Sequence, residues 1–363
     1  MEKKGHFSPR TDLAVEARDM IVEKSGDSLD KKGIISTEEN RGGVKVSTVK
    51  ITSDASVDIG KQPGTYVTIY TDSVKRQDTD RQQMASKVLA EEIGKLLEES
   101  GIEKGMKGLV VGLGNWQVTP DALGPMTIEQ VLVTNHLFEL EVETVHGDYR
   151  PVAAVSPGVM GLTGMETSDI IFGIAEKFKP DFIIAIDALA ARAVERLNET
   201  IQLSNAGIHP GSGIGNKRKA ISKETLGVPV FALGVPTVVD AATIASDTMD
   251  DLLKYLGRTW ENDNKPSQSL VPGGFHFGKE KLTDDDMPDM DKRQVFMGMV
   301  GTLSDNEKRE LVREVLGPID HNLIVTPKEV DGFMEDMSHV IAAGINAALH
   351  GKIAADESSG YTR

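Results

Sequence analysis

Two aspartates follow apolar runs near the middle of the chain, and their side chains could carry out hydrolysis. Asp121 follows the run 109–111 across a Gly-rich turn, and Asp187 directly follows the run 182–186. Continuous apolar runs rich in β-branched residues are typical of parallel strands that are covered on both faces. Because chemistry in an open α/β sheet gathers beyond the carboxyl ends of its strands, we expect the two carboxylates to lie side by side.

In a close pair of carboxylates, one group is expected to act as a general acid and the other as a general base. Two neighbouring carboxylates cannot both ionise easily, so one of them keeps its proton. The ionised group can then take a proton from water while the protonated group polarises a carbonyl, which suits amide hydrolysis. Either aspartate could instead cap a following helix. However, Asp187 follows five apolar residues, where an uncompensated carboxylate is costly. We therefore predict Asp121 and Asp187 as the catalytic residues.

Other motifs give weaker predictions. Gly112 and Gly114 begin like a dinucleotide fingerprint, but Gln117 occupies the position of its third glycine. The chain has no cysteine and no His-Glu-x-x-His motif, which excludes disulfides, thiolate ligands and a zincin site. The Gly-rich loop that starts at His209 has no nucleophile elbow around Ser212, and we expect it to border the site without catalysing. The sequence thus predicts neither a cofactor nor a metal.

The pattern along the chain predicts strands that alternate with helices, which is typical of a doubly wound sheet. Strands are expected at 108–112, 152–155, 182–187, 200–203 and 228–233, with helices at 127–138, 167–178, 188–197 and 239–256. Two further strands, 44–52 and 66–71, predict a small antiparallel β unit near the N-terminus. A helix over 80–100 and a C-terminal helix that begins in a capping box at 326–329 complete the set. The fold class is therefore α/β.

Composition and charge narrow the functional classes. The chain has 363 residues and a formal net charge of -16, which would repel phosphate backbones and argues against direct nucleic-acid binding. No apolar run approaches the roughly 20 residues that span a bilayer, and the first residues lack the apolar core of a secretion signal. We therefore expect a cytoplasmic protein without membrane contact. A shift to acidic, loop-like composition predicts an excursion at about 257–292.

Three long stretches resemble the germination proteases of endospore-forming bacteria. They are the segments 109–126, 184–196 and 207–219, and shorter segments at 10–16 and 325–331 extend the resemblance over nearly the whole chain. The resemblance implies an αβα sandwich around a twisted, mostly parallel sheet, similar to the fold of hydrogenase maturation proteases. It also implies an endopeptidase of the forespore and spore core that degrades small acid-soluble spore proteins when germination begins. Members of the family form homotetramers.

The family resemblance also bears on the mechanism. The two aspartates proposed as catalytic in the family match Asp121 and Asp187. In the related hydrogenase proteases the equivalent carboxylates bind a metal, so a metal-dependent peptidase that uses the same residues is the alternative. The absence of an obvious histidine ligand near them favours the metal-free aspartic mechanism. A non-catalytic protein that sequesters a peptide, and a nucleotide-binding protein, are the alternatives from other classes.

Members of the family are made as zymogens, which remove their own N-terminal segment. Its enzymes cut after Glu in a Thr-Glu-(Phe or Ile)-Ala context, and residues 11–14 of this chain, Thr-Asp-Leu-Ala, are similar with Asp in place of Glu. The resemblance therefore predicts Asp12–Leu13 as the processing bond. It predicts residues 1–12 as the propeptide and residues 13–363 as a single protease domain that includes the excursion. The chain as given is expected to be the zymogen.

Overall fold

The computed structural model describes residues 11–25, 33–53, 61–142, 147–208, 219–263, 282–316, 323–351 and 353. These residues divide into two compact units, which we call the sheet unit and the helical unit. The sheet unit lies within Ser8–Val239 and Thr326–Arg363, and the helical unit within Asp240–Val325. None of the helices in this described part is long and apolar enough to cross a membrane. The assignment of 13–363 to one protease domain stays a prediction.

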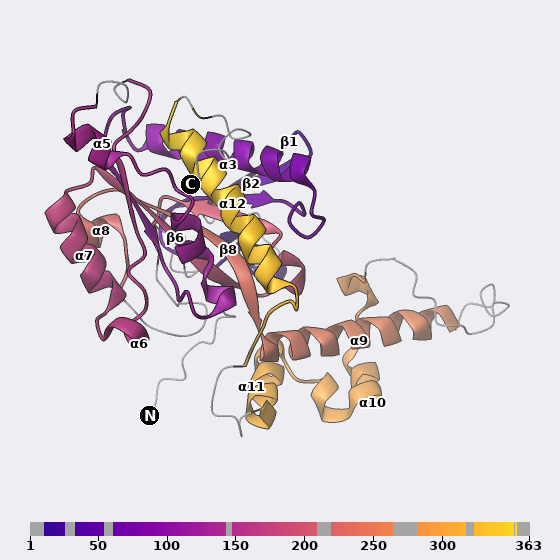
Figure 1. Cartoon of the computed structure of the whole chain (residues 1–363). Helices are drawn as coiled ribbons and strands as arrows, with labels where there is room; N and C mark the ends of the chain where they lie inside the picture. Colours follow the sequence, from indigo (N-terminus) through magenta and orange to yellow (C-terminus); the bar gives the residue numbers. More distant parts are fainter. Residues whose placement is uncertain are drawn as a thin grey trace. The chain divides into compact units, whose positions relative to one another are not determined.

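The sheet unit is built on a mixed β-sheet in the order β1-β2-β3-β7-β8-β6-β4-β5 (Figure 1). The strands are β1 (Ile34–Arg41), β2 (Val44–Ile51), β3 (Gly64–Tyr70), β4 (Gly108–Gly112), β5 (Val152–Val155), β6 (Phe182–Ala191), β7 (Thr200–Ser204) and β8 (Val230–Asp240). Strands β8, β6, β4 and β5 are parallel neighbours, and all other pairings on this path are antiparallel. The α/β class and the antiparallel unit near the N-terminus are thus confirmed. That unit continues through β7 into the parallel half of the same sheet.

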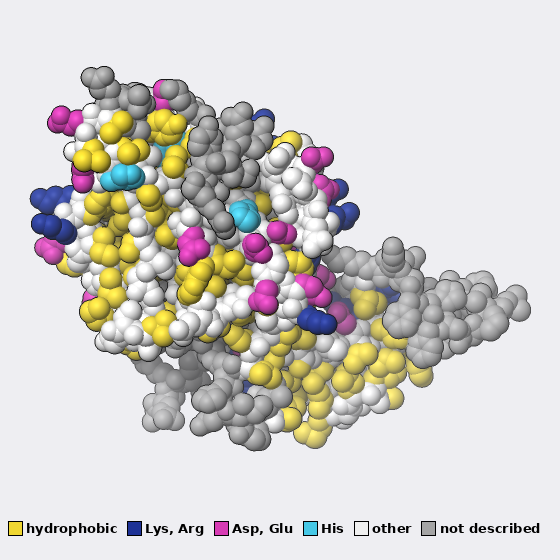
Figure 2. Space-filling view, in the orientation of Figure 1, with side chains coloured by type: hydrophobic (Ala, Val, Ile, Leu, Met, Phe, Trp, Pro, Cys, Tyr) yellow, Lys and Arg dark blue, Asp and Glu magenta, His cyan; other side chains and the backbone are white. Residues whose placement is uncertain are grey.

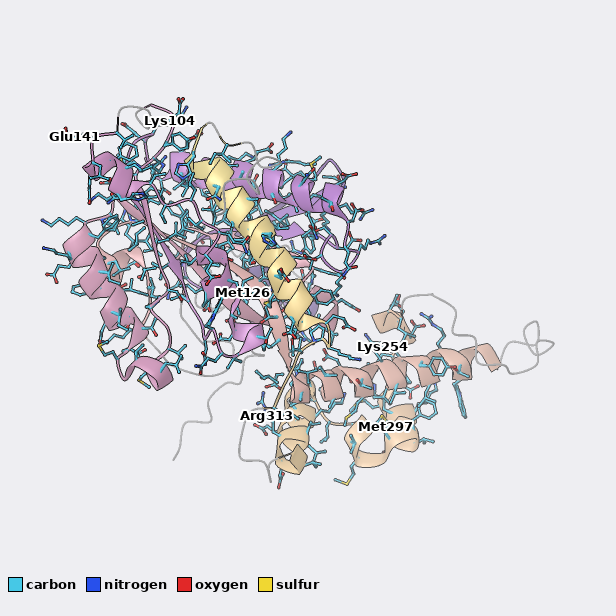
Figure 3. All side chains as sticks on the ribbon, in the orientation of Figure 1. Lys104, Met126, Glu141, Lys254, Met297 and Arg313 are labelled. Atoms are coloured by element: carbon cyan, nitrogen blue, oxygen red, sulfur yellow. The ribbon has the colours of Figure 1, made fainter. Side chains whose placement is uncertain are left out.

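One face of the sheet is covered by α3 (Thr79–Glu99) and α12 (Val330–Leu349), as Figure 1 shows. The short helix α4 (Leu123–Ile128) packs on the same side, against α12, β4 and β6. The predicted apolar stripe of α3 packs against α12 and the sheet, and Met126 of α4, labelled in Figure 3, packs against the same core. Asp78 caps α3 by accepting a hydrogen bond from the Arg81 N–H at 3.1 Å, which satisfies one of the free donors at the start of the helix. The main apolar core therefore lies between this face and these helices.

The opposite face is covered in part by α1 (Ala14–Ser25), so that helices lie on both sides of the sheet. Ala14 and Ala17 of this helix pack against Val49 and Tyr66. The remaining short helices of the sheet unit are η2 (Thr119–Asp121), α5 (Asn135–Glu139), α6 (Met160–Thr163), α7 (Thr167–Phe178), η4 (Val194–Arg196) and α8 (Lys223–Leu226). This layering agrees with the expected αβα sandwich.

Three predictions about helices are wrong. The helix expected at 127–138 is replaced by the end of α4 and by α5, and residues 129–134 between them are not helical. The helix expected at 188–197 does not form, because β6 continues to Ala191 and stays paired with β8, with a register shift between Leu189 and Ala190, before the short turn η4. Pairing with a neighbouring strand outweighs the intrinsic helix preference of this alanine-rich stretch. The C-terminal helix begins at Val330 without a side-chain cap, since the Thr326 hydroxyl donates instead to the Thr237 carbonyl at 2.9 Å. Asp187 therefore lies inside a strand and caps no helix.

The helical unit contains α9 (Ala241–Asp263), η6 (Asp284–Asp286), α10 (Met290–Gly301), α11 (Asp305–Leu316) and the short strand β9 (Ile324–Val325). Helix α9 packs against both α10 and α11. Lys308 of α11 is 2% exposed and forms an ion pair with Asp250 of α9, so a buried charge is compensated at this helix contact. The predicted excursion at 257–292 starts inside α9, and its residues 264–281 lie outside the described part.

Candidate active site

The turn after β4 brings Asp121 back against the end of its own strand. The Leu113 N–H donates to the Ile186 carbonyl of β6 at 2.7 Å, and the chain then turns at Gly114 with φ of 114°. A Cβ atom on Gly114 would lie 1.9 Å from the Asp121 carbonyl oxygen. Only glycine combines this backbone conformation with such a close approach. The Gly-rich turn therefore serves to place Asp121.

The carboxylate of Asp121 is held by the same turn. The Asn115 N–H donates to Asp121 Oδ2 at 2.9 Å and to the Asp121 carbonyl oxygen at 3.1 Å. Helix α4 has Ala122 at its N-cap and no side-chain cap, so Asp121 does not play the alternative role of a helix cap. Asp121 is half-buried. Its side chain is thus oriented by the backbone while part of it stays accessible.

Asp187 lies inside β6 and is 7% exposed. Its Oδ1 atom accepts the Ala188 N–H at 3.0 Å. The neighbouring residues Ile184 and Ile186 belong to the core beneath α3 and α12. Because side chains alternate along a strand, Asp187 faces the other side of the sheet, where α1 begins.

Contacts between η2 and the strands bring the two aspartates to one end of the sheet. Strands β4 and β6 are parallel neighbours, and Gly112 at the end of β4 pairs with Ile186, directly before Asp187. Helix η2, which ends at Asp121, contacts β6. The Thr237 hydroxyl of β8 donates to the Pro120 carbonyl at 2.6 Å. Both predicted catalytic residues therefore lie where β4 ends beside β6, and their sharing of a proton stays a prediction.

The N-terminal segment is bound to β6 close to Asp187. The Asp12 N–H donates to the Ala190 carbonyl at 2.9 Å, and the Ala190 N–H donates to Asp12 Oδ2 at 2.9 Å. Ala190 lies three residues after Asp187 on the same strand. The predicted processing bond, Asp12–Leu13, thus adjoins the strand that carries one of the predicted catalytic residues.

Further side chains hold both sides of this bond. Gln202 Nε2 donates to the Asp12 carbonyl at 3.0 Å, and Gln202 Oε1 accepts the Ala14 N–H at 2.7 Å. Lys61 Nζ donates to the Thr11 carbonyl at 2.9 Å. Leu13 is fully buried. The segment 11–14 is therefore an ordered part of the sheet unit.

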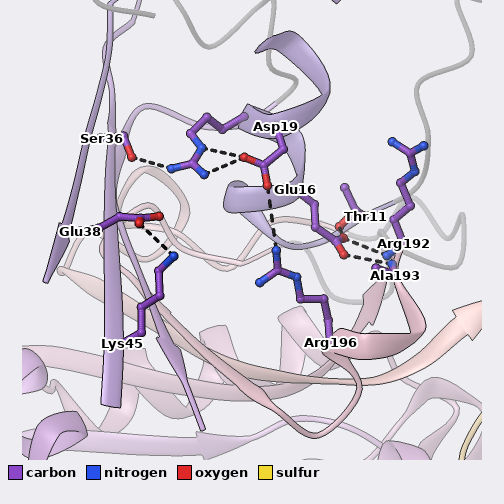
Figure 4. A network of polar contacts seen from close by, with 10 residues as sticks. Thr11, Glu16, Asp19, Ser36, Glu38, Lys45, Arg192, Ala193 and Arg196 are labelled. Atoms are coloured by element: carbon purple, nitrogen blue, oxygen red, sulfur yellow. Dashed lines mark hydrogen bonds and ion pairs between the residues drawn. The ribbon is translucent and has the colours of Figure 1, made fainter. Parts of the chain in front are cut away.

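Charges gather around this segment. Burial lowers the pKa of Lys61, and the carboxylates of Asp12 and Glu16 partly offset this effect. Glu16 is 6% exposed and accepts the N–H groups of Arg192 at 2.8 Å and Ala193 at 3.0 Å (Figure 4). Backbone donors thus satisfy a buried carboxylate just after β6 ends.

The Thr11 hydroxyl links this carboxylate to the predicted processing bond. Thr11 Oγ1 donates to Glu16 (Figure 4). The same oxygen accepts the Leu13 N–H at 3.1 Å. The sequence alone does not predict these long-range contacts. One signal exists, because Gln202 is a polar residue in the buried strand β7, and a buried amide needs partners.

Two further sequence predictions concern the Gly-rich loop at His209 and the metal-dependent alternative. The loop from His209 to Asn216 lies outside the described residues. Within the described ranges, no group of three or more His, Asp or Glu side chains could hold a metal ion. The metal-dependent alternative stays a prediction, and we derive no step through a metal.

Comparison with known proteins identifies the relatives of this chain. A protein-family model described as germination protease matches residues 14–362. The germination protease of Oceanobacillus iheyensis is 61% identical over 360 residues, which cover 98% of both chains. The germination protease of Bacillus cereus (strain ATCC 10987 / NRS 248) is 57% identical over 357 residues, covering 98% of this chain and 97% of the relative. The germination protease of Bacillus mycoides shows the same identity and coverage.

Proposed function

Because this chain belongs to the germination protease family, we propose that it initiates the degradation of small acid-soluble spore proteins when a spore germinates. The family makes it a peptidase with protein substrates. The position of Asp121 and Asp187 at the junction of β4 and β6 is the observation that supports a catalytic site there. The enzyme acts in the forespore and spore core, and it needs no cofactor.

The two aspartates activate water for hydrolysis of the peptide bond. One carboxylate takes a proton from water, and the other, still protonated, donates a hydrogen bond to the carbonyl oxygen under attack. The water oxygen forms a bond to the carbonyl carbon, the C–N bond breaks, and the amine leaves with a proton. Each carboxylate already accepts one backbone N–H, from Asn115 and Ala188 respectively, which supports a fixed orientation for both.

The enzyme is made as a zymogen that cuts its own Asp12–Leu13 bond. The binding of Asp12 to Ala190, three residues past Asp187, supports this proposal because it holds the bond near a catalytic strand. Residues 1–12 then form the propeptide. A first residue other than Leu13 in the purified mature enzyme would contradict this choice of bond.

The working enzyme is a homotetramer. Apolar side chains gather over the helical unit in Figure 2, and those that are at least half exposed include Trp260, Met290, Val295, Met299 and Val315. Exposed apolar groups of this kind are typical of protein interfaces, which supports an assembly through this unit. The net charge of -16 supports a substrate that is taken up free of DNA.

Substitution of the two aspartates tests the catalytic site. We expect Asp121→Asn and Asp187→Asn each to slow cleavage of a small acid-soluble spore protein by about 10²- to 10⁴-fold, the range for loss of an acid or base. Asp181→Asn is the matched control, because Asp181 is exposed and precedes the same strand at its other end. Cleavage is followed by mass spectrometry of the products. Parental rates in both active-site variants would exclude the catalytic pair, whereas a parent chain that binds the substrate without cleaving it would favour a peptide-binding protein.

Chelation separates the aspartic mechanism from the metal-dependent alternative. In the aspartic mechanism a chelator leaves the cleavage rate unchanged. Loss of activity with chelator, and its return when a divalent ion is added, would favour the metal-dependent peptidase.

A further inference from the structure

We propose that Gln202 binds the peptide on both sides of the bond to be cut and stabilises negative charge on the carbonyl oxygen of that bond. The inference rests on the proposed self-processing at Asp12–Leu13. It assigns to the buried amide of β7 a direct part in binding the scissile peptide, beside the two aspartates.

The contacts of Gln202 span the predicted scissile bond. Nε2 donates to the Asp12 carbonyl oxygen, which belongs to that bond, at 3.0 Å, while Oε1 accepts the Ala14 N–H at 2.7 Å. The two partners fix the orientation of the amide, because a flipped amide would set acceptor against acceptor and donor against donor. Gln202 is 8% exposed. One side chain therefore fixes the backbone before and after the bond.

The sheet register places Gln202 on the same face as Asp187. Gln202 of β7 pairs with Gly234 of β8, and Asp187 of β6 pairs with the same glycine from the other side. Residues that pair across neighbouring strands point to the same face of a sheet. The segment that carries Asp12 and the start of α1 lies over this face. The amide and the carboxylate thus approach the peptide from one layer.

This arrangement allows the Gln202 amide to donate a hydrogen bond to the carbonyl oxygen of Asp12, which becomes negatively charged during hydrolysis. When water adds to the Asp12 carbonyl carbon, the C=O electron pair moves onto the carbonyl oxygen, and the bond to the Leu13 nitrogen then breaks. The Gln202 amide is neutral and exchanges no proton, so it acts by donating a hydrogen bond to that oxygen throughout. Loss of one such donor costs about 10²- to 10³-fold in rate.

The same contacts define a substrate class. Gln202 binds only backbone atoms of the segment, Asp12 O and Ala14 N, so its grip does not depend on side-chain identity. The side chain of Asp12 is bound separately, by the Ala190 N–H and near the positive charge of Lys61. The site therefore suits a peptide with an acidic residue before the cut bond.

Two substitutions test the role of Gln202 in self-processing of the full chain. Gln202→Met keeps the size of the side chain and removes both contacts, and we expect processing to slow by about 10²- to 10³-fold. Gln202→Glu keeps an acceptor for Ala14 but loses the donor at neutral pH. Its rate relative to Gln202→Met should rise as pH falls towards about 4, where a glutamic acid regains a proton to donate. Processing is measured by mass spectrometry.

Controls separate this inference from other causes. Gln130→Met removes an amide contact with Ser338, remote from the segment, and should process at the parental rate. Thermal unfolding establishes that the Gln202 variants are folded. Asp187→Asn is measured in parallel: if it processes normally, the proposed function fails instead. Parental processing by folded Gln202→Met, or a Gln202→Glu rate that follows Gln202→Met at every pH, would overturn the role of Gln202.

Discussion

Asp187 of β6 and Gln202 of β7 both pair with Gly234, which lies in the strand between them, β8. The side chain of Leu189 lies over the glycine between them, since a Cβ atom on Gly234 would be 2.6 Å from Leu189 Cγ. Leu189 also directly precedes Ala190, which binds Asp12. The absence of a side chain at position 234 thus determines how closely this part of β6 packs.

Gly234→Ala should therefore disturb the site without touching either polar residue. The added methyl group must displace Leu189, and overpacking of a well-packed region costs about 1–3 kcal/mol. We expect a lower melting temperature and slower processing. The control is Gly94→Ala in α3, where a Cβ atom meets nothing within 4 Å; this variant should be at least as stable as the parent. Equal stability and rate in Gly234→Ala would contradict the packing described.

Gly114→Ala tests how Asp121 is positioned. A Cβ atom at this position would collide with the Asp121 carbonyl at 1.9 Å, so the turn must move and carry the carboxylate with it. We expect loss of most peptidase activity, measured on a spore-protein substrate. Gly105→Ala introduces a side chain at φ of 94° with nothing within 4 Å, and so it isolates backbone strain from the collision. Similar activities in the two variants would show that Asp121 does not depend on this turn.

Asp12→Asn tests recognition of the acidic residue before the processing bond. An asparagine oxygen can still accept the Ala190 N–H, but the negative charge near Lys61 is lost. A hydrogen bond to a charged group is stronger than one to a neutral group by about 1–1.5 kcal/mol, so we expect processing to slow by about 5- to 10-fold. Asp19→Asn changes a half-buried acidic residue of α1 that pairs with Arg18 and takes no part in the described contacts around the processing bond, and this variant should process normally. A processing rate that is insensitive to Asp12→Asn would argue against a charge-selective site.

His350 predicts a loss of stability in acid. It is fully buried, its Nδ1 accepts the Arg150 N–H at 3.3 Å, and its Nε2 lies 3.2 Å from the Leu132 carbonyl. Both contacts are made by the neutral ring. Burial lowers the pKa of His350 from 6.5 to about 4. Below about pH 6.5 the histidine is therefore protonated in the unfolded chain but still neutral in the folded chain. The free energy of unfolding falls as the pH is lowered, until about pH 4.

The size of this effect follows from the shift in pKa. At 1.36 kcal/mol per unit, the loss amounts to about 3 kcal/mol. Denaturant unfolding between pH 7 and pH 4 measures it, and His350→Gln, which stays neutral, should flatten the pH dependence by about that amount. His136→Gln at an exposed position serves as the control and should leave the curve unchanged. A curve that His350→Gln does not alter would show that other groups carry the acid sensitivity.

Local patterns in the sequence predict much of this architecture. The apolar runs before Asp121 and Asp187 identify β4 and β6, and the rule for parallel sheets then brings the two aspartates to one end. Local pattern fails at Ala188–Ala191, because the strand there is set by pairing with β8. Local pattern also does not predict the contacts of Asp12 with Ala190 and Gln202, because these contacts join segments that are far apart in the chain.

The order of strands in the sheet bears on when the enzyme can become active. Strand β3 pairs with β7, so Tyr66 can pair with Ser204 only after both have been synthesised. Helix α3 packs against α12, which lies near the C-terminus. Contacts of such long range form late and slowly. A ribosome-bound fragment that ends before β8 lacks the middle strand between Asp187 and Gln202. The sheet around these two residues is therefore complete only after β8, which ends at Asp240, has been synthesised.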